Sequence, residues 1–322
     1  MIYWRRFFAR WLNLLGLTMA LAFAVVAVSA PLISPVDPKN PGPFKVVGRF
    51  TDQTPRPPGS AKGAAVLGTL PGGLDVFHTL VWGTREAMTF GLLVALGAFL
   101  VGVLFGAVAG YAGGRVGTLM MRVADAFLTF PPLAGAAFLQ QLAATSVVAL
   151  GGQYYFNVQL GSNMGNVIFF NGPLPFAAVL IQHVDPLLIS LILFSWMPYA
   201  RVVNTLVLTL KRTEFVLASQ AIGAKPFWVI RKHLLPNAVS PAIVLAARDV
   251  GGAVILQATM VIIGLGGNSP WGSLLSFAGN WVVGGLLSFW WVYAPVTIAM
   301  ILFGVTWNII GDGLSDALSP HS

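Results

Sequence analysis

The sequence predicts an all-α, polytopic membrane protein with about six transmembrane helices. Of its 322 residues, 57% are hydrophobic and only 9% are charged, whereas a soluble domain has roughly 25% charged residues. The apolar residues stand in long unbroken runs and not in the alternating pattern of a membrane β-barrel. Because backbone groups must be hydrogen-bonded inside hydrocarbon, these runs are expected to form helices.

The charged residues indicate membrane topology. The formal net charge is +8, but the 18 basic residues are scattered singly or in small clusters between the apolar runs. That distribution is typical of loops that orient membrane helices, and it argues against a nucleic-acid partner. The absence of cysteine excludes disulfides and thiolate metal sites.

The first predicted span lies in residues 1–33 and runs from Trp11 to Ile33, which is long enough to cross a bilayer. Basic residues precede it and place the N-terminus inside, namely Arg5, Arg6 and Arg10. Small residues before Pro31 would also fit a cleaved signal peptide, but proline directly after the cleavage point is unfavourable, and a retained anchor is the preferred interpretation.

Residues 34–86 are rich in proline and glycine, show no helical period, and are expected to form an external segment. Residues 87–318 are expected to hold five further spans, at about 87–111, 125–150, 186–208, 241–266 and 290–310. The polar stretch near 151–185, which is uncharged from Gly151 to Gln182, is expected to be a second external segment. On this count both termini lie inside.

Three details refine these spans. Glycines recur through the second span and predict close helix packing, namely Gly91, Gly97, Gly102, Gly106 and Gly110. Pro131 and Pro132 are expected to kink or break the start of the third span, after a short inside loop that contains Arg115 and Arg122. Four tryptophans are expected to mark the outer interface, namely Trp271, Trp281, Trp290 and Trp291.

The inside loop near 210–240, called the coupling loop below, is longer than a hairpin between two spans requires. Its glycine and proline residues mark helix ends and predict two short helices, at 214–222 before Gly223 and at 226–234 before Pro236. Phe215, Ala218 and Ile222 share one face of the first helix. This face would either rest on the membrane surface or dock in a groove of a partner, and the length of the loop favours docking.

Residues 214–224 (EFVLASQAIGA) and 230–238 (IRKHLLPNA) resemble the cytoplasmic loop of permease subunits of binding-protein-dependent ABC importers. The similarity is greatest to the second permease subunit of the dipeptide, oligopeptide and nickel importers, and it covers about residues 65–318. Supporting matches are GLDV at 73–76, AGYAGG at 109–114, MRVAD at 121–125, Phe130-Pro131 and NIIGDGL at 308–314.

The resemblance implies the type I importer permease fold, in a bacterial or archaeal cytoplasmic membrane. It implies a second homologous permease, two ATPase subunits that bind ATP and magnesium, and an external substrate-binding protein. The chain would form half of a pathway for peptides, with nickel chelates or other small solutes as alternatives. The loop residues that would contact the ATPase are Glu214, Phe215, Leu217, Ala218, Ser219, Ala221, Gly223, Ala224, Leu235 and Pro236.

Two features depart from the family pattern. Leu217, Ala218 and Ser219 stand where the family has a Glu-Ala-Ala triplet, so the usual glutamate is missing, and Glu214 one turn earlier is a hypothetical substitute. The segment 151–185 is also longer than the resemblance implies. It would touch a binding protein, cap the pathway or be a tolerated insertion.

The chain has no phosphate-binding loop of the Gly-x-x-x-x-Gly-Lys-Ser/Thr type. Nucleotide chemistry is therefore expected in another chain, and the protein is expected to be neither an enzyme nor a cofactor binder. A stand-alone secondary transporter or channel is the alternative class, but no inverted halves and no acidic cluster within the spans support it.

Arg248, Asp249 and Gln257 in the fifth span are the candidate pathway residues. A charge facing lipid is costly, so Arg248 and Asp249 are expected to face the bundle or a wet cavity. They would either line or gate a pathway or form structural interhelical pairs, and the sequence does not decide between these.

Overall fold

The computed structural model describes residues 7–8, 10–36, 42–47, 54–59, 65–129, 131–149, 159–160, 163–164, 185–282 and 288–318. Within these ranges the chain is almost entirely helical. Five helices are long and apolar enough to cross a membrane, or up to six if a bent pair forms one span. The predicted all-α polytopic architecture is confirmed.

The N-terminal part of the chain contains α2 (Trp11–Ile33). After η1 (Pro71–Gly73) the chain enters α3 (Val76–Ala112), the longest helix. Described pieces of the intervening segment pair with the residues just before α3, because Val46 bridges Leu74 and Arg56 bridges Thr69. This end of α3 is therefore tied to the external segment.

The second span begins earlier than the predicted 87, because α3 starts at Val76. Asp75 caps the helix through a 2.9 Å bond from the Phe77 backbone N–H, and burial raises the pKa of the Asp75 carboxyl. The polar residues that concealed the helix are bonded within the protein: Thr79 Oγ1 donates to the Asp75 carbonyl at 3.0 Å, and Ser34 Oγ and His78 Nδ1 lie 2.6 Å apart.

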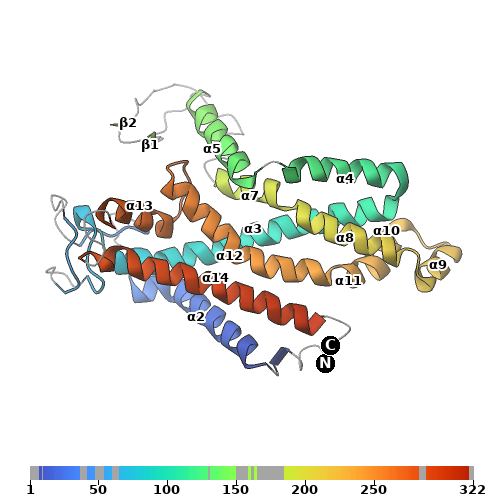
Figure 1. Cartoon of the computed structure of the whole chain (residues 1–322), viewed down its shortest axis with the longest axis horizontal. Coiled ribbons are helices and arrows are strands. Elements are labelled where there is room, and N and C mark those ends of the chain that lie inside the picture. Colours follow the sequence, from blue (N-terminus) through green and yellow to red (C-terminus); the bar gives the residue numbers. More distant parts are fainter. Residues whose placement is uncertain are drawn as a thin grey trace.

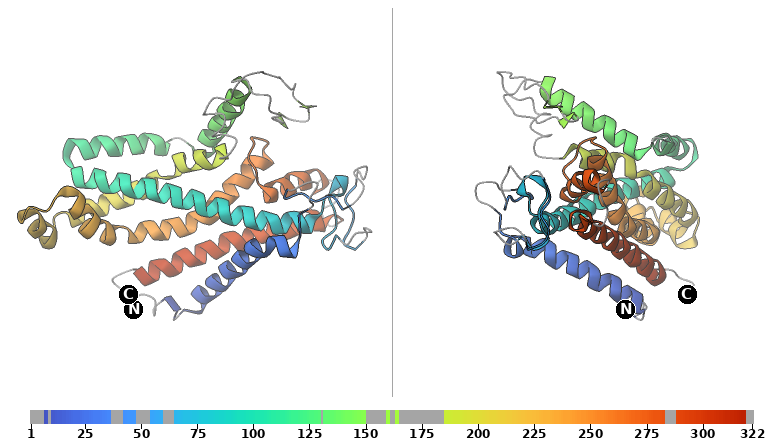
Figure 2. Two further views of the ribbon diagram at one scale, coloured as in Figure 1. Left: turned by 180° about the vertical axis from the view of Figure 1, so that it is seen from behind. Right: turned by 60° about the vertical axis from the view of Figure 1, so that its left-hand side comes forward.

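The predicted third span is a broken helix pair. α4 (Gly114–Thr129) and α5 (Pro132–Ala149) meet at an 80° bend, with Pro131 and Pro132 at the junction. The expected proline break is confirmed, but the inside loop is wrong, because Arg115 and Arg122 lie on α4. Figure 2 shows α5 leaving the bundle while α4 runs beside α3.

Little of the insertion near 151–185 lies within the described residues. β1 (Gln159–Leu160) and β2 (Asn163–Met164) form a small antiparallel pair there, with Gln159 opposite Met164. The rest of the predicted insertion before Asp185 lies outside the described residues.

The remaining core consists of α7 (Pro186–Ser195), α8 (Met197–Leu210), α12 (Ser240–Ile262), α13 (Pro270–Val282) and α14 (Trp290–Leu318). α3 lies at the centre of the bundle and packs against α8, α12 and α2, while α12 packs against α14 (Figure 1). α13 was not predicted. It packs against α3, α12 and α14 between the last two spans.

The glycines of the second span allow α3 and α8 to approach closely, as predicted. A Cβ atom at Gly106 would lie 2.3 Å from the Ala200 carbonyl oxygen, and one at Gly102 would lie 2.3 Å from the Trp196 carbonyl oxygen. Any side chain at these positions would push the two helices apart.

The predicted outer aromatic belt is wrong for two of its four tryptophans. Trp271 is only 1% exposed and donates its Nε1–H to the Leu80 carbonyl at 3.0 Å, and Trp291 is 7% exposed. Both belong to a core cluster with Phe303 and Val296. Helix packing at this end of the bundle buries rings that the pattern alone places at the membrane interface.

Candidate functional site

The coupling loop lies at one end of the bundle, the end at which α2 begins and α14 ends (Figure 1). It contains α9 (Glu214–Ala221), α10 (Pro226–Val229), the π-type turn η2 (Ile230–Leu234) and α11 (Leu235–Ala238). Lys211 anchors its first residues, because its Nζ donates to the Tyr111 carbonyl and lies 4.8 Å from the centre of the Tyr111 ring. The loop is therefore fixed to the end of α3.

Gly223 ends the first loop helix, as predicted. Its φ of +86° is a left-handed conformation that favours glycine. The Gly223 N–H donates to the Gln220 carbonyl at 3.0 Å and the Ala224 N–H donates to the Ser219 carbonyl at 3.1 Å, the pair of bonds that defines a Schellman cap. This cap sets the direction in which the chain leaves α9.

The second loop helix does not stop before Pro236, which corrects the prediction. The Leu235 N–H bonds to the Ile230 carbonyl, one residue further back than in an α-helix. A turn of this width accommodates proline, which has no N–H to donate. α11 then continues through Pro236 to Ala238. The whole stretch 226–238 is therefore helical.

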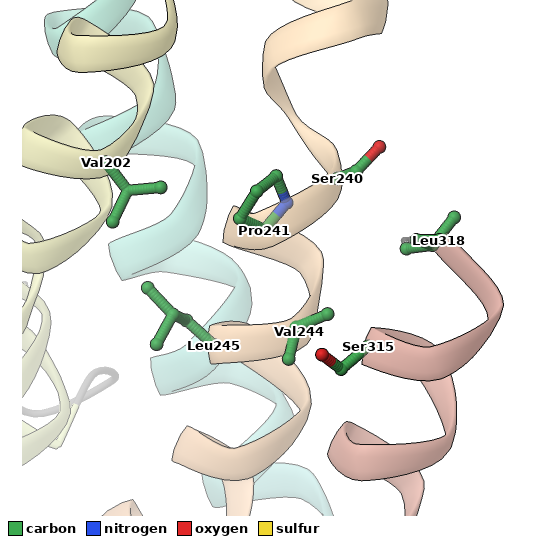
Figure 3. Close-up of a pocket in the computed structure, with 7 residues that line it drawn as sticks. All are labelled: Val202, Ser240, Pro241, Val244, Leu245, Ser315 and Leu318. Carbon is green, nitrogen blue, oxygen red and sulfur yellow. The ribbon is translucent and has the colours of Figure 1, made fainter. Parts of the chain in front are cut away.

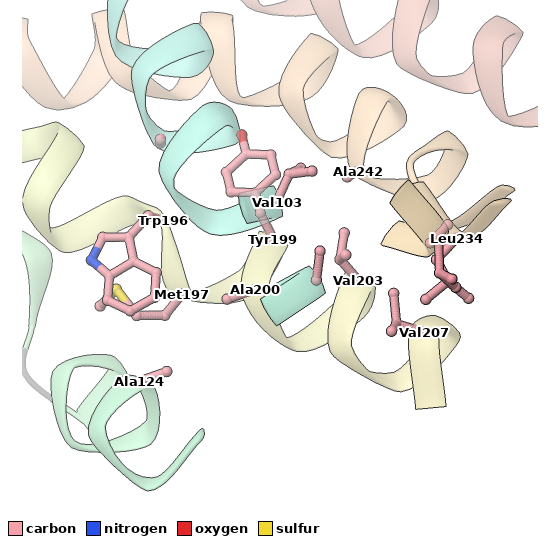
Figure 4. Close-up of a cluster of buried hydrophobic side chains, with 14 of the residues drawn as sticks. Val103, Ala124, Trp196, Met197, Tyr199, Ala200, Val203, Val207, Leu234 and Ala242 are labelled. Atoms are coloured by element: carbon pink, nitrogen blue, oxygen red, sulfur yellow. The ribbon is translucent and has the colours of Figure 1, made fainter. Parts of the chain in front are cut away.

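One face of the loop is packed into the bundle. Val216, Val229 and Leu234 are fully buried, in one hydrophobic cluster with Val203 and Val207 of α8. Figure 4 shows Leu234 beside these two valines. Apolar contact thus holds the three helical pieces against the C-terminal half of α8.

The opposite face is exposed and apolar. Ile222 is 87% exposed and Phe227 is 73% exposed, and Phe215, Leu217 and Trp228 are each about half exposed. His233 lies between two of these rings, with its centre 5.9 Å from Phe215 and 4.9 Å from Trp228. The five exposed apolar side chains are called the exposed loop face below, namely Phe215, Leu217, Ile222, Phe227 and Trp228.

The ten predicted loop residues divide between the two faces. Glu214, Phe215, Leu217, Ala218 and Ala221 are exposed on α9, as are Gly223 after its end and Pro236 on α11, while Ala224 and Leu235 are half-buried. Ser219 is buried, and its hydroxyl has no hydrogen-bond partner in the described part of the chain. Glu214 lies in the first turn of α9, where a carboxylate is favourable for the helix dipole.

The three candidate pathway residues on α12 have separate environments. Arg248 Nη2 lies 2.5 Å from Asp312 Oδ1, so Arg248 joins α12 to α14 as an interhelical ion pair. Asp249, the next residue, points elsewhere: its Oδ2 accepts a 2.5 Å hydrogen bond from the Tyr199 hydroxyl of α8. The adjacent charges therefore do not pair with each other.

Gln257, the third candidate, is packed inside the protein. It is 1% exposed, and its Nε2 donates to the Asn268 carbonyl at 3.0 Å. Asn268 belongs to the connection between α12 and α13. Gln257 therefore holds that turn against the core, which explains a polar side chain in this position.

Asp249 borders a cavity of about 220 Å³. Residues of α3, α7, α8 and α12 surround it, together with Leu128 at the end of α4 and Pro132 at the start of α5. Ser195 and Gly252 also line it, and its other walls are mainly aliphatic or aromatic. The cavity thus lies between these helices, beside the α4–α5 bend.

A second hollow, which the sequence did not indicate, lies toward the end of the bundle that carries the coupling loop. It measures about 320 Å³ and separates α8, α12 and α14, with Val202, Pro241 and Leu318 on its walls. Figure 3 shows its two serines, Ser240 and Ser315, beside otherwise apolar side chains. None of the described residues that line it is charged, whereas Asp249 lines the first cavity.

Two family models match the sequence. Residues 102–321 match the inner membrane component of binding-protein-dependent transport systems, and residues 2–55 match the N-terminal transmembrane domain of oligopeptide transport permease C. The chain belongs to this family of transport-system membrane components. The first match contains the coupling loop, Asp249 and the last two spans.

Curated relatives of this family cover nearly the whole chain. The dipeptide transport system permease of Bacillus subtilis is 31% identical over 98% of this chain and 84% of its own length. The nickel transport system permease of Escherichia coli is 29% identical over 97% of this chain and 95% of its own length. The oligopeptide transport system permease of Bacillus subtilis is 27% identical over 98% and 87%. The predicted importer-permease relationship is confirmed.

Proposed function

We propose that this permease is one membrane subunit of an ATP-driven peptide importer, and that the exposed loop face is its docking surface for an ATPase subunit. The observation that carries the proposal is the two-sided coupling loop. Val216, Val229 and Leu234 fix it to the bundle while Ile222 and Phe227 remain exposed. Apolar side chains gathered on a water-facing surface favour a protein interface.

Peptides are the proposed substrate class. Relatives named for dipeptide and oligopeptide transport support this choice, as does the match of residues 2–55 to the permease C domain. The nickel relative supports nickel chelates as the second candidate.

The proposed assembly contains this chain, a second homologous permease, two ATPases and an external binding protein, in a bacterial or archaeal cytoplasmic membrane. ATP and magnesium would be bound by the ATPases. Both chain ends would lie in the cytoplasm, on the side of the coupling loop. In the described residues the start of α2 and the end of α14 lie at that same end, and an ion pair between Arg10 and Asp316 joins them.

The proposed mechanism couples ATP hydrolysis to movement of the bundle. Closure of the two ATPases would displace the exposed loop face, and the buried side of the loop would transmit this displacement to α8 and α12. The resulting rotation of helices would expose the pathway alternately to the two sides of the membrane. Arg248 and Asp312 would keep α12 and α14 moving together.

The test is a gentle detergent purification of the tagged chain, with mass spectrometry of its partners and an ATPase assay. We expect a second permease and one or two ATPase subunits to co-purify. Reconstituted vesicles should take up radiolabelled di- or trialanine when ATP and the binding protein are supplied. Uptake of radioactive nickel with a chelator, and no peptide uptake, would support the second candidate. A chain that purifies alone and transports without ATP would contradict the proposal.

A further inference from the structure

Asp249 is a carboxylic acid in the middle of a membrane helix. It is the tenth residue of α12, whose 23 residues run from Ser240 to Ile262. At about 1.5 Å per residue, both ends of the helix are more than about 10 Å away. Ionisable groups at this depth are costly unless they meet a partner or water, and they mark functional sites.

The hydrogen bond to Asp249 leaves its charge uncompensated. The Tyr199 hydroxyl donates to Oδ2 at 2.5 Å, but a phenol carries no positive charge. Two arginines that adjoin this pair in the chain have other partners: Arg248, next to Asp249, pairs with Asp312, and Arg201, two residues after Tyr199, pairs with Asp125. Within the described ranges no cation lies at ion-pair distance from Asp249.

The cavity beside Asp249 has room for a cationic group. Its volume of about 220 Å³ is below the roughly 300 Å³ of a small-molecule pocket, so it would admit one end of a ligand. Gly252, one turn along α12, also lines it, and a Cβ atom there would have no neighbour within 4 Å. Asp249 is the one ionisable side chain among the described residues that line it.

A peptide supplies the missing charge. Its N-terminal amine has a pKa of about 7.7–8.0 and is mostly protonated at neutral pH. An ammonium group bound to a carboxylate forms short, strong hydrogen bonds, and the apolar walls would accept the first side chain. The carboxylate end of the peptide would be repelled by Asp249, so the cavity selects the amino end.

We propose that Asp249 binds the N-terminal ammonium group of a peptide during its passage through the membrane, an inference that rests on the peptide-import function proposed above. Tyr199 positions the carboxylate through its hydrogen bond to Oδ2. The role of the site is to hold a cationic end within an otherwise apolar passage.

The test compares Asp249→Asn, Asp249→Glu and the matched control Asp316→Asn in the complete reconstituted complex. Asp316 loses the same charge at the inner end of α14, outside the cavity. Trialanine uptake below saturation should fall at least about tenfold in Asp249→Asn, fall less in Asp249→Glu and stay near wild type in Asp316→Asn. Wild-type uptake should decrease above about pH 8, as the peptide amine loses its proton, and Asp249→Asn should lose this dependence.

Each other outcome overturns the inference. Equal uptake by wild type and Asp249→Asn would overturn the ammonium site alone and leave the import function intact. Failure of Asp249→Asn to retain the second permease during purification would assign the carboxylate to a basic residue of that partner. A wild-type complex that hydrolyses ATP but takes up no di- or trialanine would overturn the peptide function and the ammonium site together.

Discussion

The coupling loop and the centre of α12 differ in opposite ways from their surroundings. In the loop, which faces water, the groups without a suitable environment are apolar, with Ile222 and Phe227 as the most exposed. In α12, which lies within the membrane, the Asp249 carboxylate has no charge partner among the described residues. The loop thus exposes apolar side chains to water, and the membrane helix carries a side chain that water would solvate.

This contrast indicates the two places where the chain is expected to bind a partner or a ligand. An exposed apolar face on a structured loop favours a protein partner, and an uncompensated carboxylate beside a cavity favours a cation. Arg248 shows the alternative outcome one residue away, because Asp312 matches its charge. The region around a residue, and not its type, decides whether it is available for function.

The largest expected effect follows from Gly223→Val in the coupling loop. Valine in a left-handed conformation is strongly strained, at a cost of about 1–3 kcal/mol, so the Schellman cap should open and the exposed loop face should be displaced. Substrate-stimulated ATPase activity of the complex should fall at least about tenfold while the chain still inserts. Gly59→Val is the matched control, because Gly59 has a φ of +75° with no neighbour within 4 Å and lies in the external segment. An equal loss in both variants would contradict a specific role for the loop.

The exposed loop face itself is tested by Ile222→Ser and Phe227→Ser. Both side chains are mostly exposed, so the stability of the isolated chain should change by less than about 0.5 kcal/mol. Binding of the ATPase subunit should weaken by roughly fivefold to tenfold, measured by titration of the ATPase into detergent-solubilised permease. Val66→Ser is the control, since Val66 is 63% exposed in the external segment. Undiminished ATPase binding by both loop variants would show that this face is not the interface.

A double-mutant cycle on Arg248→Ala and Asp312→Ala measures the coupling free energy of the ion pair between α12 and α14. Polar pairs between membrane helices are worth about 0.6 kcal/mol on average, so the coupling free energy should stay below about 1 kcal/mol. Unfolding in mixed micelles is the measurement. A coupling above about 2 kcal/mol would make this pair a main structural contact and weaken its contrast with Asp249.

The smallest effect is expected at Asp185, which caps α7 outside the membrane span by accepting from the Leu187 N–H at 2.9 Å. Burial raises the pKa of this carboxyl above its ordinary value of 3.8. The stability linked to its protonation is therefore present below the unfolded-state pKa and lost as the pH rises through the folded-state pKa. Asp185→Asn keeps the cap without the charge, so its melting temperature relative to wild type should rise from about pH 4 to pH 8. A relative melting temperature that falls over this range would contradict the burial effect.

Much of the architecture followed from local patterns. The apolar runs placed α2 and α12 close to their observed bounds and α14 at its observed start, because a membrane helix must present about 20 apolar residues. α14 continues to Leu318, beyond the predicted end near residue 310. Gly223 marked the end of α9, since few residues other than glycine adopt its backbone conformation. The adjacent prolines at 131 and 132 marked the α4–α5 break for an equally local reason.

Other features depend on contacts that local sequence does not encode. The start of α3 was missed because Thr79 and His78 are bonded to distant or backbone groups, and the α11 continuation through Pro236 depends on a π-type turn. The burial of Trp271 requires α3 beside α13.

The sequence by itself determined that the chain crosses a membrane, where most spans lie and which loop holds two short helical segments. Hydrophobic length and helix-ending residues such as glycine act over a few neighbouring residues, so local sequence is enough to show them. Only the tertiary structure separated Arg248 from Asp249 and Gln257. Their roles depend on which helix lies opposite each side chain, namely α14 for Arg248, α8 and a cavity for Asp249, and the α12–α13 turn for Gln257. Charge compensation is a property of residues far apart in the chain, so packing alone decides it.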